Sequence, residues 1–235
     1  MARKHARTSL AARFFRLISF VVVFVLLLSI ALVLPLRWMT PPTTAFMLQD
    51  QSGRVPVLYE WNDWPMLGTN AALAVVAAED QRFADHFGFD LGSIQESFAS
   101  YGGGDSLRGA STITQQVAKN LYLWPGRSFV RKGIEAWFAL LIEVFWTKLR
   151  ILEVYLNVAE FGPGLYGVPA ASRVYFGKTP AALTEAEAAL LAAVLPNPRI
   201  LDAGRPSDYV QQRQRWIEGH MQRMHREGWL IRISQ

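Results

Sequence analysis

The sequence predicts a mainly α-helical domain behind one apolar N-terminal helix. An uncharged apolar run fills positions 17–36, about the ~20 residues that a membrane-spanning helix needs. From Asn70 onward, apolar residues recur at helical spacing, and turns containing Gly or Pro separate the segments. A length of 235 residues suffices for one domain with its own core, so a second large domain is not required.

Positive charge is concentrated around the apolar run. Residues 1–37 hold no acid and six basic residues: Arg3, Lys4, Arg7, Arg13, Arg16 and Arg37. Because cytoplasmic flanks carry such an excess, we expect a basic cytoplasmic tail (1–16), a single transmembrane helix (17–36) in the inner membrane and a periplasmic or extracytoplasmic domain. A cleaved signal peptide is the alternative, but its apolar region is usually shorter, and the best small-x-small site, Ser29-Ile30-Ala31, falls inside the run.

Composition argues against several other classes of function. Without those six basic residues, 18 of the 24 Lys and Arg remain against 19 Asp and Glu, so the exported part lacks the basic excess of a nucleic-acid-binding domain. The chain has no cysteine, which excludes disulfides and thiolate chemistry. Its four His form no HExxH-type cluster, so no His-based metal site is predicted.

Residues 37–69 are predicted to be a linker and membrane-proximal segment before a domain at 70–235. Trp38 stands where an interfacial anchor would stand, 40–44 is expected to be a short extended linker, and 45–68 a loop with a short strand. The predicted loops are 99–109 and 161–167. The first predicted helix covers 71–86, with Asn70 as its cap and Gly88 as its stop, and a second begins at Ser111 or Thr112. A long helical stretch covers 129–161, with a break near Thr147. A further helix covers 183–196 and is ended by Pro196, and the last one begins at Pro206 and Ser207.

Two adjacent acids, Glu79 and Asp80, open the stretch EDQRFADHFGFD. In a helical projection Asp80 lies within the apolar stripe, whereas Glu79 lies at its edge beside Phe83 and His86. We expect Asp80 to be a buried structural acid bonded to backbone N–H groups or to a polar side chain. Glu79 is either an ordinary rim carboxylate or a general base whose pKa is raised by desolvation.

Two further stretches carry polar and basic residues near helix starts. In GASTITQQVAKN (109–120), Thr112 and Gln115 fit a capping box, and the helix N-terminus with Lys119 two turns on is either an anion site or an ordinary helix start. In GRSFVRKGIE (126–135), Arg131 and Glu135 are spaced i,i+4, and a surface ion pair is the alternative to a cation cluster with Arg127 and Lys132. The apolar residues 136–146 indicate either a deep core helix or one that touches lipid.

A fourth stretch, TKLRILEVYLNVAEFG (147–162), has a predicted core stripe of Leu152, Tyr155 and Leu156. The same stretch holds Glu153 and Asn157 at i,i+4 spacing. The two side chains can bond each other or tie down a loop, and we expect them to be structural supports.

In this order and spelling the four stretches resemble the motifs of the peptidoglycan glycosyltransferase family, over roughly residues 70–200. GVPAASRVYFGK and LTEAEAALLAAVLPNP resemble the end of that domain. The family implies a mostly α, lysozyme-like fold. The chain has no SxxK or KTG motif of a penicillin-binding transpeptidase, so it is similar to the monofunctional biosynthetic form.

The resemblance implies polymerisation of lipid II into glycan strands during cell wall biogenesis, with inversion and release of undecaprenyl pyrophosphate. Glu79 and Glu135 are then the two catalytic carboxylates, Glu79 being the base. The substrate and pyrophosphate would be bound by Ser111, Thr112, Gln115, Gln116, Lys119, Arg127, Arg131 and Lys132. Asp80, His86, Glu153 and Asn157 would be structural supports. Glu135 either orients the cations or holds Mg²⁺ or Mn²⁺, although the sequence demands no cofactor.

The implied partners are lipid II, the growing glycan, membrane lipids and other cell-wall synthesis proteins, with no nucleic acid. Two alternatives remain open from the residues alone. A lysozyme-like or lytic enzyme shares the α-rich fold and a catalytic Glu but has no use for a pyrophosphate-type cation cluster. A membrane-anchored scaffold would need no catalytic carboxylate.

Overall fold

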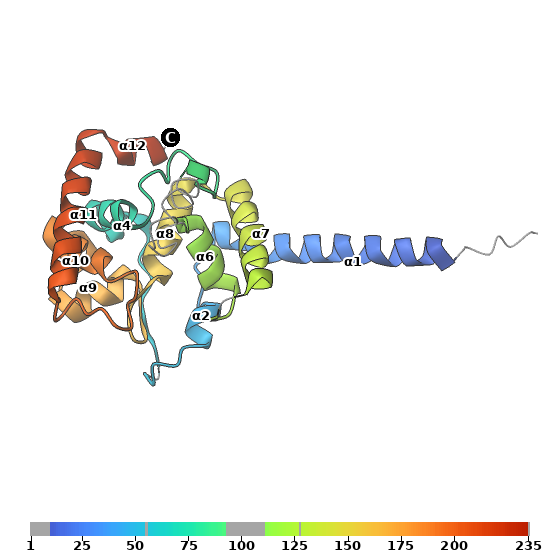
Figure 1. The fold of residues 1–235 in the computed structure, drawn as a ribbon, viewed down its shortest axis with the longest axis horizontal. Coiled ribbons are helices and arrows are strands. Elements are labelled where there is room, and N and C mark those ends of the chain that lie inside the picture. The colour runs from blue at the N-terminus through green and yellow to red at the C-terminus, as the bar shows by residue number, and fades with distance from the viewer. Residues whose placement is uncertain (1–9, 55, 93–110, 127, 235) are drawn as a thin grey trace, which may run out of the picture.

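A long apolar helix, α1 (Leu10–Val33), projects from a body of shorter helices (Figure 1). The computed structural model describes residues 10–54, 56–92, 111–126 and 128–234. Within that part of the chain, the stretch from Leu10 to Arg37 is the one long and apolar enough to cross a membrane. The helix includes Arg13, Arg16 and the uncharged run up to Val33, and the end of that run lies in a 3-10 turn, η1 (Pro35–Arg37).

The body consists of two adjoining groups of helices (Figure 1). In the group far from α1, α4 (Thr69–Glu79) packs against α10 (Glu185–Ala193) and α11 (Asp208–Arg226). In the group beside α1, α6 (Ile113–Tyr122) packs against α7 (Phe129–Phe145) and α8 (Lys148–Val158). Residues 71–77 of α4 are all buried, so this helix runs through the core and delivers its last residue, Glu79, to the boundary between the groups.

A small sheet joins the segment before α4 to the chain after α8. Its strand order is β1 (Leu58–Tyr59), β3 (Leu165–Tyr166), β2 (Glu160–Gly162), with β1 parallel and β2 antiparallel to β3. The short strand expected within 45–68 is confirmed, and two short helices, α2 (Ala45–Leu48) and α3 (Trp64–Leu67), accompany it. The prediction of a loop at 161–167 is wrong, because this stretch forms most of the β2–β3 hairpin.

The helix predicted at 71–86 is shorter than expected. It begins at Thr69 and ends at Glu79, and Asn70 does not cap it but donates from Nδ2 to the carbonyl of Leu183. Asp80 leaves the helix at φ −162° and ψ 74°, and the chain continues in turns. The helical projection of residues beyond Glu79 was therefore wrong, because Asp80 turns away to bond another element.

The other helix boundaries agree more closely with the sequence. The capping box of Thr112 and Gln115 forms, Thr147 caps α8 after the expected break, and Ser207 caps α11. The second half of the 129–161 prediction ends early, at Val158, since β2 begins at Glu160. Further along the chain, three more helical elements were not predicted: α9 (Val168–Phe176), η3 (Pro180–Ala182) and α12 (Trp229–Ser234), which follows the helix expected to be last. The loop predicted at 99–109 lies outside the described residues.

The C-terminal end of α1 is built into the body. Val33 is fully buried, and its carbonyl accepts a hydrogen bond of 3.0 Å from Trp146 Nε1. The Arg150 guanidinium donates to the carbonyls of Leu36 and Met39. The expected extended linker at 40–44 is docked as well, since Pro41 and Thr44 are buried.

Candidate active site

Glu79, the last residue of α4, points between α6 and α11. Its Oε2 accepts a hydrogen bond of 2.9 Å from Gln116 Nε2, and its Oε1 lies 3.4 Å from Arg213 Nη2. The side chain is 14% exposed, which is more enclosed than the rim position expected from the projection. Burial raises the pKa of Glu79, while Gln116, Arg213 and Lys119 act in the opposite direction.

The Gln116 amide is itself held from the other side. Tyr155 on α8 donates from its hydroxyl to Gln116 Oε1 at 3.0 Å, which leaves Gln116 Nε2 to face Glu79. Burial raises the pKa of Tyr155 well above its ordinary value, so the phenol stays a neutral donor. Tyr155 was expected only as part of a core stripe, because nothing in its local sequence reveals a partner 39 residues away.

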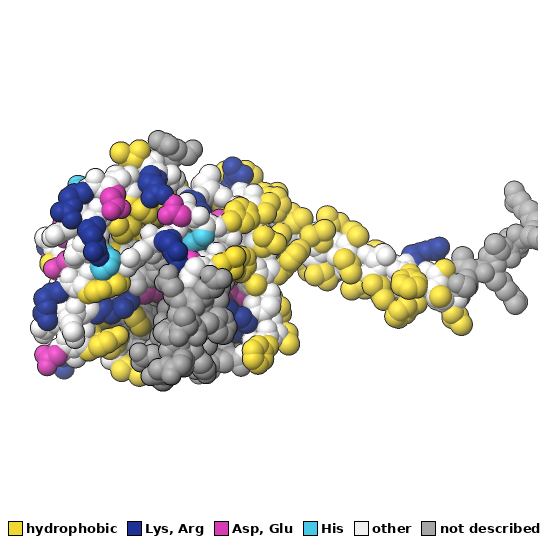
Figure 2. Space-filling view, turned by 45° about the horizontal axis from the view of Figure 1, so that its top comes forward, with side chains coloured by type: hydrophobic (Ala, Val, Ile, Leu, Met, Phe, Trp, Pro, Cys, Tyr) yellow, Lys and Arg dark blue, Asp and Glu magenta, His cyan; other side chains and the backbone are white. Residues whose placement is uncertain are grey.

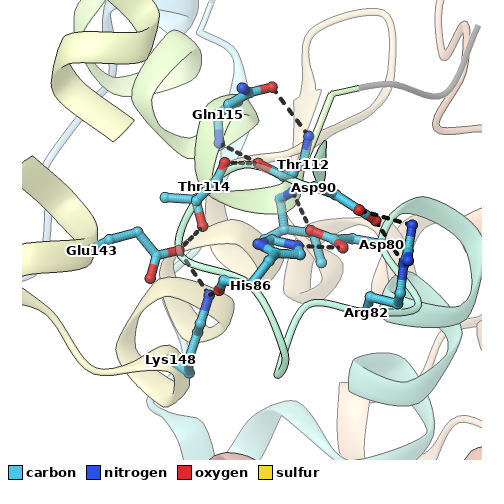
Figure 3. Close-up of polar contacts among 11 residues, drawn as sticks. Asp80, Arg82, His86, Asp90, Thr112, Thr114, Gln115, Glu143 and Lys148 are labelled. Atoms are coloured by element: carbon cyan, nitrogen blue, oxygen red, sulfur yellow. Dashed lines mark hydrogen bonds and ion pairs between the residues drawn. The ribbon is translucent and has the colours of Figure 1, made fainter. Parts of the chain in front are cut away.

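Asp80 joins the end of α4 to the start of α6. Its Oδ2 accepts from the backbone N–H of Ile113 at 3.0 Å, and its Oδ1 lies 2.8 Å from His86 Nε2 (Figure 3). Asp80 is therefore buried and hydrogen-bonded, which is the setting predicted for it. The positive end of α6 faces this internal carboxylate, an arrangement that stabilises a helix N-terminus.

Further hydrogen bonds within the protein occupy the backbone N–H groups at the start of α6. Thr112 Oγ1 accepts from the N–H of Gln115 and donates to the carbonyl of Gly88 at 2.7 Å. Gln115 Oε1 accepts in return from the N–H of Thr112. The N–H groups of Ile113 and Gln115 are thus committed to protein acceptors, so the predicted anion site at this helix start does not have them as donors.

A buried polar cluster that the sequence did not predict lies next to this turn (Figure 3). Glu143 Oε1 accepts from Thr114 Oγ1 at 2.6 Å and from Lys148 Nζ at 2.8 Å. Lys148 Nζ also donates to the carbonyl of His86 at 2.6 Å, which fixes the turns after Asp80. An acid within the apolar run 136–146 was the available signal, since carboxylates are rarely buried unless they are paired.

Glu135 lies at the centre of the predicted cation cluster. Its Oε2 is 2.9 Å from Arg131 Nη1, and its Oε1 is 2.5 Å from Lys132 Nζ, which also lies 3.3 Å from Ser111 Oγ. The i,i+4 pair forms, but Glu135 is only 3% exposed, so the alternative of a surface ion pair is wrong. Arg127 lies outside the described residues.

Lys119 connects the cluster to Glu79. The charges of Glu135 and Glu79 both act on its ammonium group, as do those of Arg131 and Lys132. Burial lowers the pKa of Lys119, and Glu135 is the largest opposing influence. The boundary between the helix groups therefore holds two enclosed carboxylates, Glu79 and Glu135, and Lys119 lies within electrostatic reach of both.

The residues around Glu135 do not fit a divalent metal. Both carboxylate oxygens are already paired with Arg131 and Lys132, which supply positive charge where a metal ion would supply it. Over the residues that the structure describes, no group of three or more His, Asp or Glu side chains is arranged to hold a metal ion.

Glu153 and Asn157 fasten the segment before α3 through its backbone. Glu153 Oε1 accepts from the N–H of Trp64 at 2.7 Å. The Asn157 amide pairs with both the N–H and the carbonyl of Asn62, at 2.8 and 2.9 Å. Both expected arrangements are present: these side chains tie down a loop, and Asn157 Nδ2 also donates to the backbone carbonyl of Glu153 at 2.8 Å.

Comparisons with known proteins agree with this arrangement. The family model described as Transglycosylase matches residues 57–222. Three curated relatives are each named biosynthetic peptidoglycan transglycosylase. The Pseudomonas aeruginosa protein is 48% identical over 88% of this chain and 92% of its own, the Stutzerimonas stutzeri protein 49% over 92% of each, and the Ectopseudomonas mendocina protein 50% over 84% of each. The chain therefore belongs to the transglycosylase family.

Proposed function

We propose that this chain polymerises lipid II into the glycan strands of the cell wall. The observation that carries the proposal is that the largely enclosed, hydrogen-bonded carboxylate of Glu79 lies within electrostatic reach of Lys119, on which the charges of Glu135, Arg131 and Lys132 also act. The names of the curated relatives support the same reaction. A polymerase of this kind needs one group that accepts a proton and cations that stabilise the negative charge developing on the leaving pyrophosphate.

Glu79 is the general base of the proposed reaction. The GlcNAc 4-hydroxyl of incoming lipid II gives its proton to Glu79, and its oxygen bonds to the MurNAc anomeric carbon of the growing chain. The bond from that carbon to undecaprenyl pyrophosphate breaks with inversion, and the electron pair leaves with the pyrophosphate. Such general-base help is worth roughly 10²–10⁴-fold in rate.

The cations stabilise the leaving pyrophosphate, which needs positive charge rather than a proton. Lys119, Arg131 and Lys132 supply that charge, and Arg127 is a further predicted member. Glu135 acts by holding Arg131 and Lys132 in place through its two oxygens. Gln116 orients Glu79, whereas the Gln115 amide serves the capping box, so we assign Gln115 to the helix start.

The membrane orientation follows from the charges and the apolar surface. The basic N-terminal tail favours a cytoplasmic N-terminus in the inner membrane and a periplasmic body. Hydrophobic side chains continue from α1 onto the adjacent end of the body, whereas charged ones gather at the opposite end (Figure 2). That adjacent end includes an exposed apolar stripe on α7, formed by Val130, Trp137, Leu140 and Val144. We propose that this stripe enters the headgroup layer, close to the lipid-linked substrate.

Polymerisation of purified lipid II by the full-length protein in detergent micelles tests the function. We expect glycan strands from the wild type and a loss of at least about 10²-fold in kcat for Glu79→Gln, with lipid II binding largely kept. Glu187→Gln is the matched control, because Gln can replace Glu in the α10 capping box and the residue lies on another helix.

Finished peptidoglycan serves as the second substrate in the same assay. Release of fragments from it without consumption of lipid II would identify a lytic enzyme and refute the proposal. Equal activity of Glu79→Gln and Glu187→Gln would remove Glu79 from the reaction.

A further inference from the structure

Arg213 on α11 reaches across to the end of α4. Its Nη2 donates to the carbonyl of Ala78 at 3.1 Å and lies 3.4 Å from Glu79 Oε1. No sequence pattern connects Arg213 with Glu79, which are 134 positions apart. One guanidinium group therefore contacts the backbone and the carboxylate at the C-terminal end of the same helix.

The position of Arg213 is fixed by the packing of α11. Val210 and Ile217, one turn to either side, are buried in the core, and Gln214 Nε2 donates to the carbonyl of Ala186 on α10. The Arg213 Nε is buried and has no hydrogen-bond partner among the described residues. A buried donor without a partner destabilises a fold, so fold stability alone is a poor explanation for this side chain.

We propose that Arg213 is a positioning residue for Glu79, one that fixes the carboxylate against Gln116 and keeps it ionised within its enclosed site. The proposal rests on Glu79 acting as the base. Oε2 of Glu79 accepts a hydrogen bond from Gln116, and Oε1 accepts one from Arg213. Because both oxygens are held, the orientation of the carboxylate group is fixed. Lone pairs remain on both oxygens for a substrate hydroxyl.

The other groups that face Glu79 do not take over this task. Lys119 on α6 is a second cation, but it is shared with Glu135. Gln116 is neutral, and Asp80 disfavours a second negative charge beside it. Tyr155 on α8 is a neutral phenol that contacts Gln116 instead. Arg213 is the cation in the described part of the chain that makes a direct contact with the Glu79 carboxylate.

The test measures lipid II polymerisation against pH for full-length Arg213→Gln and Arg213→Lys in micelles. For Arg213→Gln we expect kcat to fall about tenfold or more with little change in KM, and the acid limb to move up by about one pH unit. Arg213→Lys keeps the charge and should return the acid limb most of the way. Arg215→Gln, an exposed position on the same helix, should match the wild type.

An independent readout separates this proposal from the proposed function. Carboxyl ¹³C NMR, assigned with Glu79→Gln, follows the titration of Glu79 directly and needs no substrate. If the wild type fails to polymerise lipid II, the proposed function fails, yet a higher Glu79 titration midpoint in Arg213→Gln would still support the contact. An unchanged midpoint in a folded Arg213→Gln protein, or an unchanged acid limb, would overturn the positioning role.

Discussion

The Glu79 side chain is enclosed by Gln116, Arg213 and the end of α4, and burial raises its pKa. A carboxyl group whose pKa is raised on folding favours the fold while protonated, and that contribution is lost as the pH rises through the folded-state pKa. At neutral pH the ionised Glu79 therefore lowers the stability of the protein. In the proposed reaction, the same enclosure makes Glu79 a stronger base than an exposed carboxylate.

We accordingly expect Glu79→Gln to unfold at a higher temperature than the wild type at pH 7. The difference should shrink as the pH falls toward 4, because wild-type Glu79 then becomes protonated. Thermal melts of both proteins in micelles across this pH range measure it. A difference that stays constant with pH would contradict the burial argument.

Asn157 is a buried polar side chain with a structural role. Its amide bonds both the N–H and the carbonyl of Asn62, as the backbone of a neighbouring strand would do. Asn157→Ala removes both of these hydrogen bonds and a third one to the carbonyl of Glu153, and it should lower the free energy of unfolding by about 2–3 kcal/mol, measured by denaturant unfolding. Asn62→Ala is the control, because the bonds involve only the backbone at that position. It should change stability by less than about 0.5 kcal/mol, and equal effects of the two variants would refute the assignment.

The helix α9 begins and ends at a glycine, and the two glycines are constrained for different reasons. Gly167 has φ +84°, and a Cβ there would lie 2.4 Å from the carbonyl oxygen of Asn157 on α8. Gly177 has φ +64°, with nothing within 4 Å of the added carbon. Only the first glycine thus permits close contact between two elements.

Alanine at each end of α9 separates these causes. Gly177→Ala should cost about 1–2 kcal/mol, the strain of a left-handed backbone alone. Gly167→Ala should cost at least about 3 kcal/mol, because the α8 backbone must also move. Thermal and denaturant unfolding compare the two, and a Gly167→Ala protein as stable as Gly177→Ala would show that α8 and α9 can separate freely.

Local signals predicted several helix starts, because Thr112, Thr147 and Ser207 cap helices through atoms only three residues away. The end of α4 could not be predicted in this way. Asp80 leaves the helix because it bonds Ile113, a partner supplied by a segment 33 residues later.

The residues of the candidate site also divide into those that a sequence pattern could identify and those that only long-range contacts reveal. Glu79, Gln116 and Glu135 were proposed from the sequence because the stretches that contain them resemble family motifs. Arg213, Tyr155 and Glu143 were not, since each acquires its role from a contact between helices that no local pattern encodes.

The junction between α1 and the body depends on Arg150, which donates to the carbonyls of Leu36 and Met39 and pairs with Glu153. Arg150→Leu should lower the free energy of unfolding in micelles by about 2–4 kcal/mol and speed amide hydrogen exchange around residues 36–39. Arg173→Leu is the control, because its ion pair with Glu60 is largely exposed and worth at most about 1 kcal/mol. Equal exchange in both variants would show that the junction does not need Arg150.

The seating of Val33, Leu36 and Pro41 in or against the body has a mechanical consequence. A helix that continues rigidly into its domain behaves as a lever arm, so any tilt of α1 in the bilayer turns the whole body with it. For the membrane-anchored polymerase proposed above, the height of Glu79 over the lipid surface would then be set by the protein itself, and we expect that height to suit a substrate whose sugars stand one pyrophosphate away from the lipid.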